Sequence, residues 1–529
     1  MRWLSKGLVC AITFAGLVGG HGIPALGSAA NIYIAQSAVG AANGADCNDT
    51  YAYTFFNSAS NWGSGAAQIG PGTTVYLCGT FTGTAGNSML TVRGSGTSGN
   101  PVLIQFTTGA ELTAPYWSSN NGTAPTSGAI TINGYNYITV DGGSNGLITS
   151  TADGTALTYQ EMNVGIYVSG SSGIEIRNLT INNIYLRTGT GSSDSSAAGN
   201  SADIWFAGNT TNASIHGCTL SDAHGGIEVE FDNSTVSGFT IYNNTVSHHA
   251  WGIQFGSGSD SEKATGISVY GNTVTNWNDW ADVNATYHTD GIFFYAGKYG
   301  VGGSITPSVY NNYLYGDLGG GIGISPVTSF IYCSTNALCS IFNNVIVDTG
   351  NDDPWGMINI GAQAQSGSVI YNNTIVAGGG GSLDIGMAGS ATTSLENNIF
   401  AHGTGIAIWP NTFSSVAFAD YDDYYSESII ALDNNSGTPN YVTTLSAWQG
   451  SPYNHEAHGT TGNPLLNGSE QPQSGSAAIG LGSNLTSLCS TLPALCYDKN
   501  GVLRSATAAW DAGAYVYTAT PTNLSAVPH

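Results

Sequence analysis

The chain has 529 residues, of which only 8% are charged and 74 are Gly. Its formal charge of −24 comes from 33 acidic and 9 basic residues. This charge argues against a protein that binds nucleic acid or anionic membranes, because like charges repel. Abundant Gly with few charged residues favours stacked β-structure with tight turns over helical bundles.

Residues 1–30 have the pattern of a secretory signal peptide. Arg2 and Lys6 precede an apolar stretch at residues 7–20, and small residues at 27–30 offer a cleavage site. A buried N-terminal helix is the alternative. The apolar stretch is too short to span a bilayer and no later segment is apolar enough, so we expect a secreted protein, extracellular or periplasmic, with no membrane or nucleic-acid partner. Cleavage would leave 7 basic and 33 acidic residues, a charge of −26.

Eight cysteines are present, and seven remain once the signal peptide with Cys10 is removed. Export permits them to form disulfides. Cys218 is left over from the pairing, and we expect it to be a buried free thiol. The expected bridges join two pairs that are close in sequence and a third pair near the N-terminal end: Cys333–Cys339, Cys489–Cys496 and Cys47–Cys78.

A six-residue pattern recurs at intervals of about 25 to 40 residues: apolar, any, Asn, Asn, any, apolar. It is clearest at Ile241-Tyr-Asn-Asn-Thr-Val246. Asn tolerates left-handed turn geometry, and an inward-facing Asn can bond to the Asn of the next coil. The pattern therefore predicts a solenoid with an Asn turn in each coil. Cys218 precedes the series formed by the second Asn of each repeat: Asn244, Asn272, Asn312, Asn344, Asn373 and Asn398.

A second pattern, a small residue followed by apolar, any, apolar, alternates with a period of two and predicts half-buried strands. Two strands and two turns per coil would give a parallel β-helix. We expect this helix, with its N-terminal cap, over residues 31–415, and an irregular C-terminal capping segment over residues 416–529, where the repeat is lost. The inward residues expected to stack are Ile227, Ile253, Ile292, Ile322 and Ile406.

The repeats resemble those of the pectate-lyase-like superfamily. The tail, with Asp498-Lys-Asn-Gly501, Arg504 and Trp510-Asp-Ala-Gly-Ala-Tyr515, is similar to the C-terminal segment of secreted members. The resemblance spans most of residues 31–520 and implies an all-β, right-handed parallel β-helix. The superfamily holds glycoside hydrolases, polysaccharide lyases, uronate epimerases, esterases and non-catalytic adhesins, so the resemblance implies the fold more strongly than the reaction.

The active groove is expected along one sheet, where outward residues of neighbouring coils meet. Glu228 and Glu230 are outward on one strand, about 7 Å apart, and Asp203 lies one coil away. Inverting glycosidases hold their two carboxyls roughly 6.5–9.5 Å apart; a Ca²⁺ site or a solvated pair is the alternative. Aligned on the inward Ile, the first outward position reads Trp205, Glu228, Gln254, Phe293, Gly323, Asn359, Asp384 and Ala407.

The coil insertion between Asn272 and Asn312 is rich in aromatic and charged residues. It suits a sugar cleft, because aromatic faces bury pyranose rings while carboxylates and amides bond the hydroxyls. A Trp-anchored loop that packs on the solenoid is the alternative. The expected substrate contacts come from this insertion and its neighbours: Trp205, Trp251, Gln254, Trp277, Trp280, Tyr295 and Lys298.

The segment His288-Thr-Asp-Gly-Ile292 resembles the Asn-Thr-Asp-Gly motif of polygalacturonase-type glycoside hydrolases. The Asp of that motif is a catalytic carboxylate, so the resemblance implies this role for Asp290. The sequence departs from the family because Gly319-Gly-Gly321 replaces its Asp-Asp, and no Gly-His-Gly or Arg-x-Lys follows. These departures argue against galacturonan as the substrate.

We therefore predict a carbohydrate-active enzyme, a glycoside hydrolase that cleaves a neutral or weakly acidic polysaccharide by carboxylate acid/base catalysis. We expect a monomer that requires no cofactor, with Ca²⁺ binding left open. A Ca²⁺-dependent polysaccharide lyase and a non-catalytic carbohydrate-binding solenoid are the alternatives. The expected catalytic residues are Asp290, Glu230, Glu228, Asp203, His249 and His288.

Overall fold

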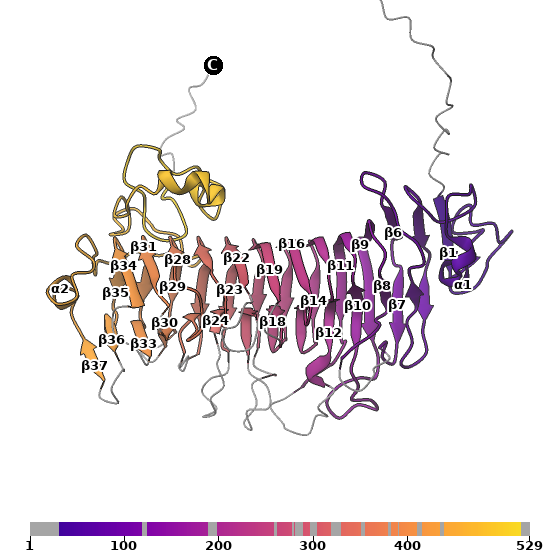
Figure 1. Ribbon diagram of the computed structural model, residues 1–529, viewed down its shortest axis with the longest axis horizontal. Coiled ribbons are helices and arrows are strands. Elements are labelled where there is room, and N and C mark those ends of the chain that lie inside the picture. The colour runs from indigo at the N-terminus through magenta and orange to yellow at the C-terminus, as the bar shows by residue number, and fades with distance from the viewer. Residues whose placement is uncertain are drawn as a thin grey trace, which may run out of the picture.

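A typical coil of the chain contributes three short strands, one to each side of an elongated tube (Figure 1). Each strand pairs in parallel with its counterpart one coil along, so the right-handed parallel β-helix is confirmed. The predicted signal peptide, residues 1–30, lies outside the described residues. The chain is described by a computed structural model over residues 31–118, 124–188, 198–258, 262–277, 280, 289–296, 304–318, 329–350, 355–378, 382–389, 391–409, 415–433 and 439–519.

One side of the tube is a 13-stranded sheet, here called the groove sheet. Its strands are parallel except for the last, which pairs antiparallel with the one before it. The strands are β5 (Leu90–Thr91), β8 (Ile130–Asn133), β10 (Val164–Ser169), β12 (Ala202–Ala207), β15 (Gly225–Glu230), β18 (Trp251–Gly256), β21 (Asp290–Tyr295), β24 (Ser329–Cys333), β27 (Ile358–Ile360), β30 (Leu383–Ala388), β33 (Thr404–Trp409), β36 (Ala431–Asp433) and β37 (Asn440–Val442).

The other two sides are joined into one 24-stranded sheet. The first face comprises β1 (Asn31–Ala35), β2 (Tyr51–Ala52), β3 (Thr74–Leu77), β6 (Val102–Phe106), β9 (Ile138–Ser150), β11 (Ser172–Asn182), β13 (Thr211–His216), β16 (Thr235–Tyr242), β19 (Lys263–Tyr270), β22 (Ser304–Tyr310), β25 (Ser340–Phe342), β28 (Ser368–Tyr371), β31 (Thr393–Glu396) and β34 (Val416–Asp420). The long strands β9 and β11 continue onto the second face, which comprises β4 (Thr80–Thr82), β7 (Glu111–Ala114), β14 (Thr219–Ser221), β17 (Thr245–Ser247), β20 (Thr273–Thr275), β23 (Tyr313–Gly316), β26 (Val345–Asp348), β29 (Thr374–Val376), β32 (Ile399–Ala401) and β35 (Asp423–Tyr425).

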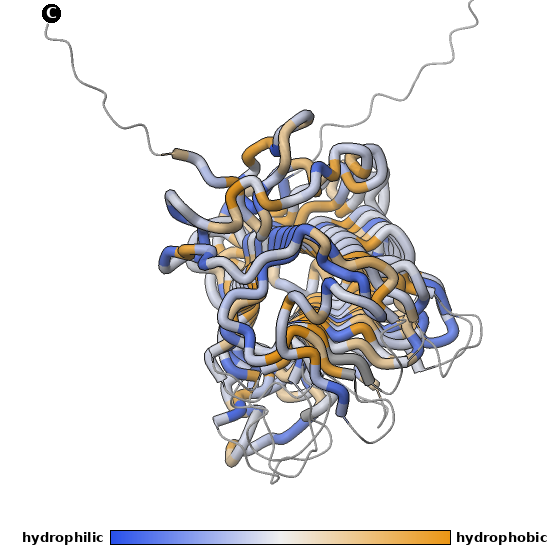
Figure 2. The backbone as a smooth tube through the Cα atoms, turned by 90° about the vertical axis from the view of Figure 1, so that its left-hand side faces the viewer, coloured by the Kyte–Doolittle hydropathy of each residue, from blue (hydrophilic) through white to orange (hydrophobic). Residues whose placement is uncertain are grey.

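The expectation of two strands per coil was wrong. In one coil β16 runs to the Asn turn, β17 follows it on the second face, and β18 then enters the groove sheet. The strand after the turn has only three residues and a single inward residue. In β17 this residue is Val246, which is also the last apolar position of the Asn-Asn pattern, so the sequence did not show it as a separate strand. The Asn-Asn pair is therefore the corner between two faces of the tube, whose strands surround a hydrophobic interior (Figure 2).

The inward ladder of Asn side chains is confirmed. The Oδ1 of Asn272 accepts hydrogen bonds from both the backbone N and the Nδ2 of Asn244, each at 3.0 Å. The same arrangement repeats from Asn272 through Asn398. At its start the N–H of Cys218 donates to Asn244 Oδ1 at 3.0 Å, and at its far end the carboxylate of Asp422 accepts from Asn398.

The stack of inward Ile residues in the groove sheet is confirmed, with one change of register. The expected strand around Ile322 lies outside the described residues, and β24 instead places Ile331 between Ile292 and Ile358. The outward residue of that coil is therefore Tyr332 and not Gly323. Two coils after β24, β30 places Gly386 outward and buries Asp384, because its inward residue is Ile385. The observed outward column is Thr131, Tyr167, Trp205, Glu228, Gln254, Phe293, Tyr332, Asn359 and Gly386.

The three expected disulfides are present, and Cys218 is buried and free. Burial raises the pKa of the Cys218 thiol to about 12, so the thiol stays protonated and unreactive at neutral pH. Cys218 thus serves as an apolar residue at the start of the Asn ladder.

The parallel pairing continues beyond the expected end of the helix at residue 415. Strands β34, β35 and β36 form a further coil, in which Tyr421 and Asp422 replace the Asn pair. The rest of the chain folds back over the outside of both faces of the 24-stranded sheet (Figure 1). The short helices are α1 (Thr54–Asn57), η1 (Ala59–Asn61), η2 (Ala198–Asn200), α2 (Leu445–Gln449), η6 (Thr486–Ser490) and η7 (Pro493–Cys496). No helix in these described segments has the length and apolar character needed to cross a membrane.

The first Asn of the late turns anchors this returning C-terminal segment. Asn343 donates from Nδ2 to the carbonyl of Tyr497 at 2.7 Å and accepts from Arg504 Nη2 at 2.9 Å. Asn372 and Asn397 bond other parts of the segment in the same way. The two residues of the Asn pair therefore have separate tasks: the second stacks inside the tube, and the first holds the C-terminal segment outside it.

Candidate functional site: a groove with an acidic row

An acidic row runs along β15 and the turn after it, on the outer surface of the groove sheet. In the strand register Glu228 stands opposite Trp205, and Glu230 stands opposite Ala207. The small side chain of Ala207 leaves the neighbouring space open. Asp232 follows Glu230 by two residues and is exposed in the turn. One strand thus brings three carboxyl groups to the same surface.

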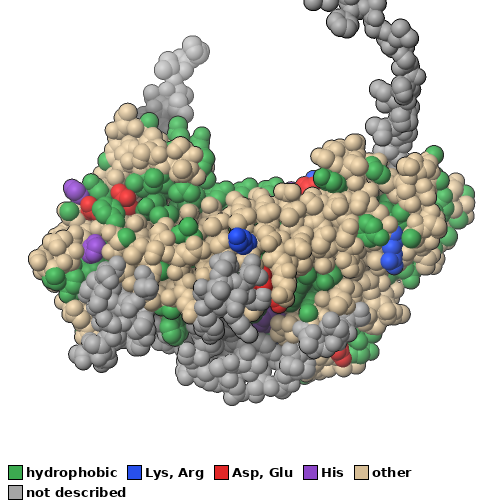
Figure 3. All heavy atoms as spheres, in the orientation of Figure 1, with side chains coloured by type: hydrophobic (Ala, Val, Ile, Leu, Met, Phe, Trp, Pro, Cys, Tyr) green, Lys and Arg blue, Asp and Glu red, His purple; other side chains and the backbone are tan. Residues whose placement is uncertain are grey.

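Two adjoining hollows of about 400 Å³ each flank this row. Because both hollows are lined by Glu230, Asp232 and Trp251, they form one groove, with the carboxyls near its middle. Figure 3 shows acidic side chains at the surface in the central part of the molecule. Aromatic side chains, which can stack on sugar rings, lie toward both ends of the groove: Tyr167 and Trp205 at one end, Phe293 and Tyr295 at the other.

Glu228 is buried in the floor of this groove. Gly225 makes room for it, since a Cβ at residue 225 would lie 1.9 Å from Glu228 Oε1. The Nδ1 of buried His224 lies 3.4 Å from the same oxygen, and the His224 ring packs edge-on against Trp251 with 4.5 Å between the ring centroids. Burial, and then the charge of Glu230, raise the pKa of Glu228 well above its usual range. Burial thus favours the protonated form of Glu228.

Glu230 lies at the centre of the groove. The residue retains some exposure, yet its carboxyl is surrounded by enough protein that burial, and then the charge of Asp232, raise its pKa to about 8. Gln254 Nε2 donates to Glu230 Oε1 at 3.0 Å, which partly opposes this rise. At pH 7 most Glu230 side chains would be protonated and in contact with the open groove, which is the condition a general acid requires.

Asp232 is the residue of this site that the sequence analysis missed. Its Oδ1 accepts hydrogen bonds from Ser257 Oγ at 3.1 Å and from the Gly258 N–H at 2.6 Å. The signal was present, because Asp232 continues the period-two series of Glu228 and Glu230. The strand ends at Glu230, but Asp232, two residues later, continues the acidic row along the same surface.

Several predicted site residues do meet in the groove. Trp205 and Trp251 form aromatic walls, and Gln254 binds a carboxyl of the acidic row. Residues of β12, β15, β18 and β21 contribute to this lining, as the coil-by-coil alignment predicted. The predicted residues that line it are Trp205, Glu228, Glu230, Trp251, Gln254 and Tyr295.

Asp203 and His249 form a separate pair inside the tube. Asp203 Oδ2 lies 2.8 Å from His249 Nε2, and the two side chains are only 0% and 1% exposed. His249 reaches past Gly226, where a Cβ would lie 3.4 Å from its Cε1. Burial raises the pKa of Asp203 well above its usual range and lowers that of His249 to about 3. Both groups are therefore neutral at pH 7.

The position of Asp203 differs from the one we expected beside Glu228. Asp203 directly precedes the inward Ile204, at the corner where the chain enters the groove sheet, and there its side chain turns into the tube. Neither Asp203 nor His249 is among the described residues that line the groove. The structure thus places this pair where it supports the wall of the tube.

The predicted residues of the long insertion are buried where they are described. Asp290 of β21 pairs with Trp251 of β18 in the strand register. It is fully buried and accepts a hydrogen bond from the Ser329 N–H at 3.2 Å. Trp277 donates from Nε1 to the carbonyl of Asp290 at 3.2 Å. Trp280 packs against Tyr185, His224 and the guanidinium of Arg187. Trp277 and Trp280 are therefore packed against the tube. His288, Lys298 and most of the insertion lie outside the described residues.

The part of the chain that the structure describes contains no group of three or more His, Cys, Asp or Glu side chains placed to hold a metal ion. The acidic row is spread along a strand, so its carboxyls do not converge on one point as ligands of Ca²⁺ do.

No protein-family model and no curated protein matches the chain. Similar solved structures include a GH136 lacto-N-biosidase from Eubacterium ramulus, with a TM-score of 0.49, 14% identity, and 72% of this chain and 64% of that chain covered. This chain thus spans less than two thirds of the length of that protein. PfbA, a surface adhesin of Streptococcus pneumoniae, has a TM-score of 0.42, 13% identity, and 73% and 88% coverage.

Pectate lyase Pel9A has a TM-score of 0.44 and 11% identity, with 93% of this chain and 98% of that chain covered. At such identities the likeness concerns the fold alone. The fold is the parallel β-helix that the repeats predicted, and its assignment rests on the strand pairing described above.

Proposed function

We propose that the protein is a secreted glycoside hydrolase that cleaves a neutral polysaccharide in the groove on the groove sheet. The observation that carries the proposal is the environment of Glu230. Its pKa is raised to about 8 beside the exposed carboxyl of Asp232, between aromatic walls. A protonated acid beside a second carboxylate is the pair of groups that glycoside hydrolysis requires.

In this proposal Glu230 donates its proton to the glycosidic oxygen as the bond to the anomeric carbon breaks. Asp232 acts from the other side of the sugar, either as the base that activates water or as the nucleophile. Trp205 at one end of the groove and Tyr295 at the other hold sugar rings on the two sides of the acids. Glu228, buried beneath and in contact with His224, fixes the shape of the floor and does not touch the substrate.

The lining of the groove favours a neutral substrate. Among its described lining residues there is no Lys or Arg to pair with a uronate carboxylate. The net charge of −24 also repels a polyuronate. This distribution disfavours the lyase alternative, because elimination from a uronate needs its carboxylate to be neutralised.

Three disulfides in the described chain fit an exported protein. Export also fits a polymeric substrate, since a polysaccharide cannot enter the cell intact. Secretion is therefore part of the same proposal.

The test is the release of reducing sugar from a panel of neutral polysaccharides by the parent protein and by Glu230→Gln. General acid catalysis contributes on the order of 10²–10⁴-fold, so Glu230→Gln should lose activity by that factor and keep its fold. Glu111→Gln, a half-buried Glu on β7 at the N-terminal end, is the matched control and should remain fully active. Full activity of Glu230→Gln would reject the site, and binding of a glycan by the parent without any turnover would favour the non-catalytic alternative.

A further inference from the structure

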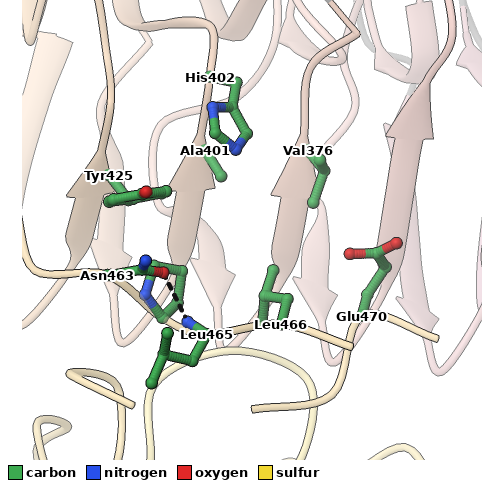
Figure 4. Close-up of a pocket in the computed structure, with 9 residues that line it drawn as sticks. Val376, Ala401, His402, Tyr425, Asn463, Leu465, Leu466 and Glu470 are labelled. Carbon is green, nitrogen blue, oxygen red and sulfur yellow. Dashed lines mark hydrogen bonds between the residues drawn. The ribbon is translucent and has the colours of Figure 1, made fainter. Parts of the chain in front are cut away.

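A second opening lies far from the groove, between the second face and the returning C-terminal segment. Its volume is about 350 Å³, enough for a sugar ring with room for water. Val376 of β29 and Ala401 of β32 lie along one wall, and the segment at residues 463–470 forms the opposite wall (Figure 4). Tyr425 and Glu470 lie toward opposite ends of this space (Figure 4).

The opening is unusual because the adjacent part of the same face is closely covered. Ile399 packs against Ala478 and Ala512, and the N–H of Ala514 donates to Thr374 Oγ1 at 2.9 Å. Protein interfaces within a chain normally pack without such voids. The C-terminal segment thus covers one outward column of side chains closely, and the opening lies beside the next column. In that column Val376 and Tyr425 are half-buried, whereas Ala401 between them is buried.

Three residues around the opening adopt the left-handed backbone conformation, which bulky side chains rarely use. They are His402 with φ of 71°, Leu465 with φ of 43° and Glu470 with φ of 58°. Glu470 is held in this state by a tight turn, in which its N–H donates to the carbonyl of Asn467 at 3.0 Å. His402 lies at the same corner as His248 and Asn276 of earlier coils, which share this conformation, so only Leu465 and Glu470 are particular to this opening.

The polar groups around the opening have the chemistry of a sugar site. Glu470, His402 and Asn463 provide a carboxyl, an imidazole and an amide, and Tyr425 adds a ring and a hydroxyl. The half-buried side chain of Val376 and the ring of Tyr425 can receive the C–H face of a pyranose, while the polar groups bond its hydroxyls. The described lining contains no Lys or Arg, so a neutral sugar fits better than a uronate.

We propose that this opening is a second, non-catalytic binding site for a neutral pyranose unit of a polysaccharide. It would anchor the polymer on the second face while the groove sheet carries the reaction. The site does not depend on the proposed hydrolase activity, since it contributes nothing to the acidic row.

The experiment measures retardation of the protein in native gels that contain β-glucan, xylan or galactomannan, with polygalacturonate as the anionic comparison. All variants carry Glu230→Gln, so that cleavage does not remove the probe. Tyr425→Ala combined with Glu470→Gln should weaken binding to at least one neutral polymer by about tenfold or more. Tyr441→Ala, which removes a tyrosine that is 54% exposed and lies outside the opening, should bind as the parent does.

Equal retardation of the pocket variant and its parent would overturn the second site, as would the absence of retardation by any neutral polymer. With Glu230 restored, the same pocket substitutions should leave the cleavage of short soluble oligosaccharides unchanged. A loss of that activity would mean that the opening belongs to the reaction, whereas failure of the hydrolase proposal would appear as inactivity of every version on every substrate.

Discussion

At the scale of single residues, Glu228 and Glu230 show how position along one strand changes the chemistry of identical side chains. Glu228 sits above Gly225 and against His224, so it is enclosed by protein. Glu230 lies opposite Ala207, so the space beside it stays open to the groove. Both pKa values are raised, mainly by burial, but only Glu230 combines a retained proton with access to substrate.

The pKa of Glu230 makes a prediction about pH. A group that must be protonated to act loses its function as the pH rises through its pKa, so activity should fall above pH of about 8. Gln254→Ala removes the hydrogen bond that stabilises the ionised form of Glu230, so the pKa of Glu230 should rise and the loss of activity should occur at higher pH. The measurement is kcat/KM against pH for both proteins, and an alkaline limb that does not move would contradict the assignment of Glu230.

The sequence located this site in part. Glu228, Glu230, Trp205 and Gln254 were predicted to face outward together, because the alternation of a strand assigns faces directly. Asp203 was misplaced because it lies at a corner, where alternation no longer tells which way a side chain points. The insertion also lacks strand alternation, so its tryptophans could not be assigned a direction from the sequence. Trp280, predicted to contact sugar, packs on the tube.

At the scale of elements, the Asn ladder ties neighbouring coils together. The backbone N–H and the Nδ2 of Asn312 both donate to Asn344 Oδ1, and the Nδ2 also donates to the carbonyl of Val269. The Oδ1 of Asn312 accepts two bonds from Asn272. The sequence predicted this ladder because the Asn pair repeats. It did not predict the third strand of the coil, which needs only three residues and a single inward side chain.

Replacing Asn312 tests the ladder. Asn312→Ala would leave several buried polar groups of the neighbouring coils without partners, at a cost of about 2–5 kcal/mol in the free energy of unfolding. Thr219→Ala, an exposed position on β14 of the second face, should change that free energy little. Urea denaturation of the two variants makes the comparison, and equal stability would show that the ladder adds nothing.

At the scale of the whole molecule, the last coil ends the helix with a buried group of acids. Asp422 takes the place of the next ladder Asn, and its N–H donates to Glu456 Oε2 at 3.1 Å. Asp423 is nearby and also buried, and Glu427 is half-buried. Burial raises the pKa of Asp423 to about 8 and those of Glu427 and Glu456 to about 7, and it raises that of Asp422 well above its usual range.

These raised pKa values predict that the protein is more stable in mild acid than in mild alkali. Between the unfolded-state pKa of about 4 and the folded-state values, the folded chain binds more protons, so the free energy of unfolding falls as the pH rises. The fall should extend to pH of about 8. Asp423→Asn should flatten it and Glu111→Gln should not, which thermal unfolding between pH 5 and 9 can show; stability that rises with pH would contradict this account of the last coil.

The most direct test of the central claim is the mass of the products. The parent protein is incubated with the neutral polysaccharide that it cleaves, in water enriched in heavy oxygen, and the oligosaccharides are analysed by mass spectrometry. Hydrolysis in the groove predicts products that carry one heavy oxygen at each new reducing end, and no products from Glu230→Gln. Products lighter by one water would identify elimination instead, and labelled products from Glu230→Gln at the parent rate would contradict the assigned site.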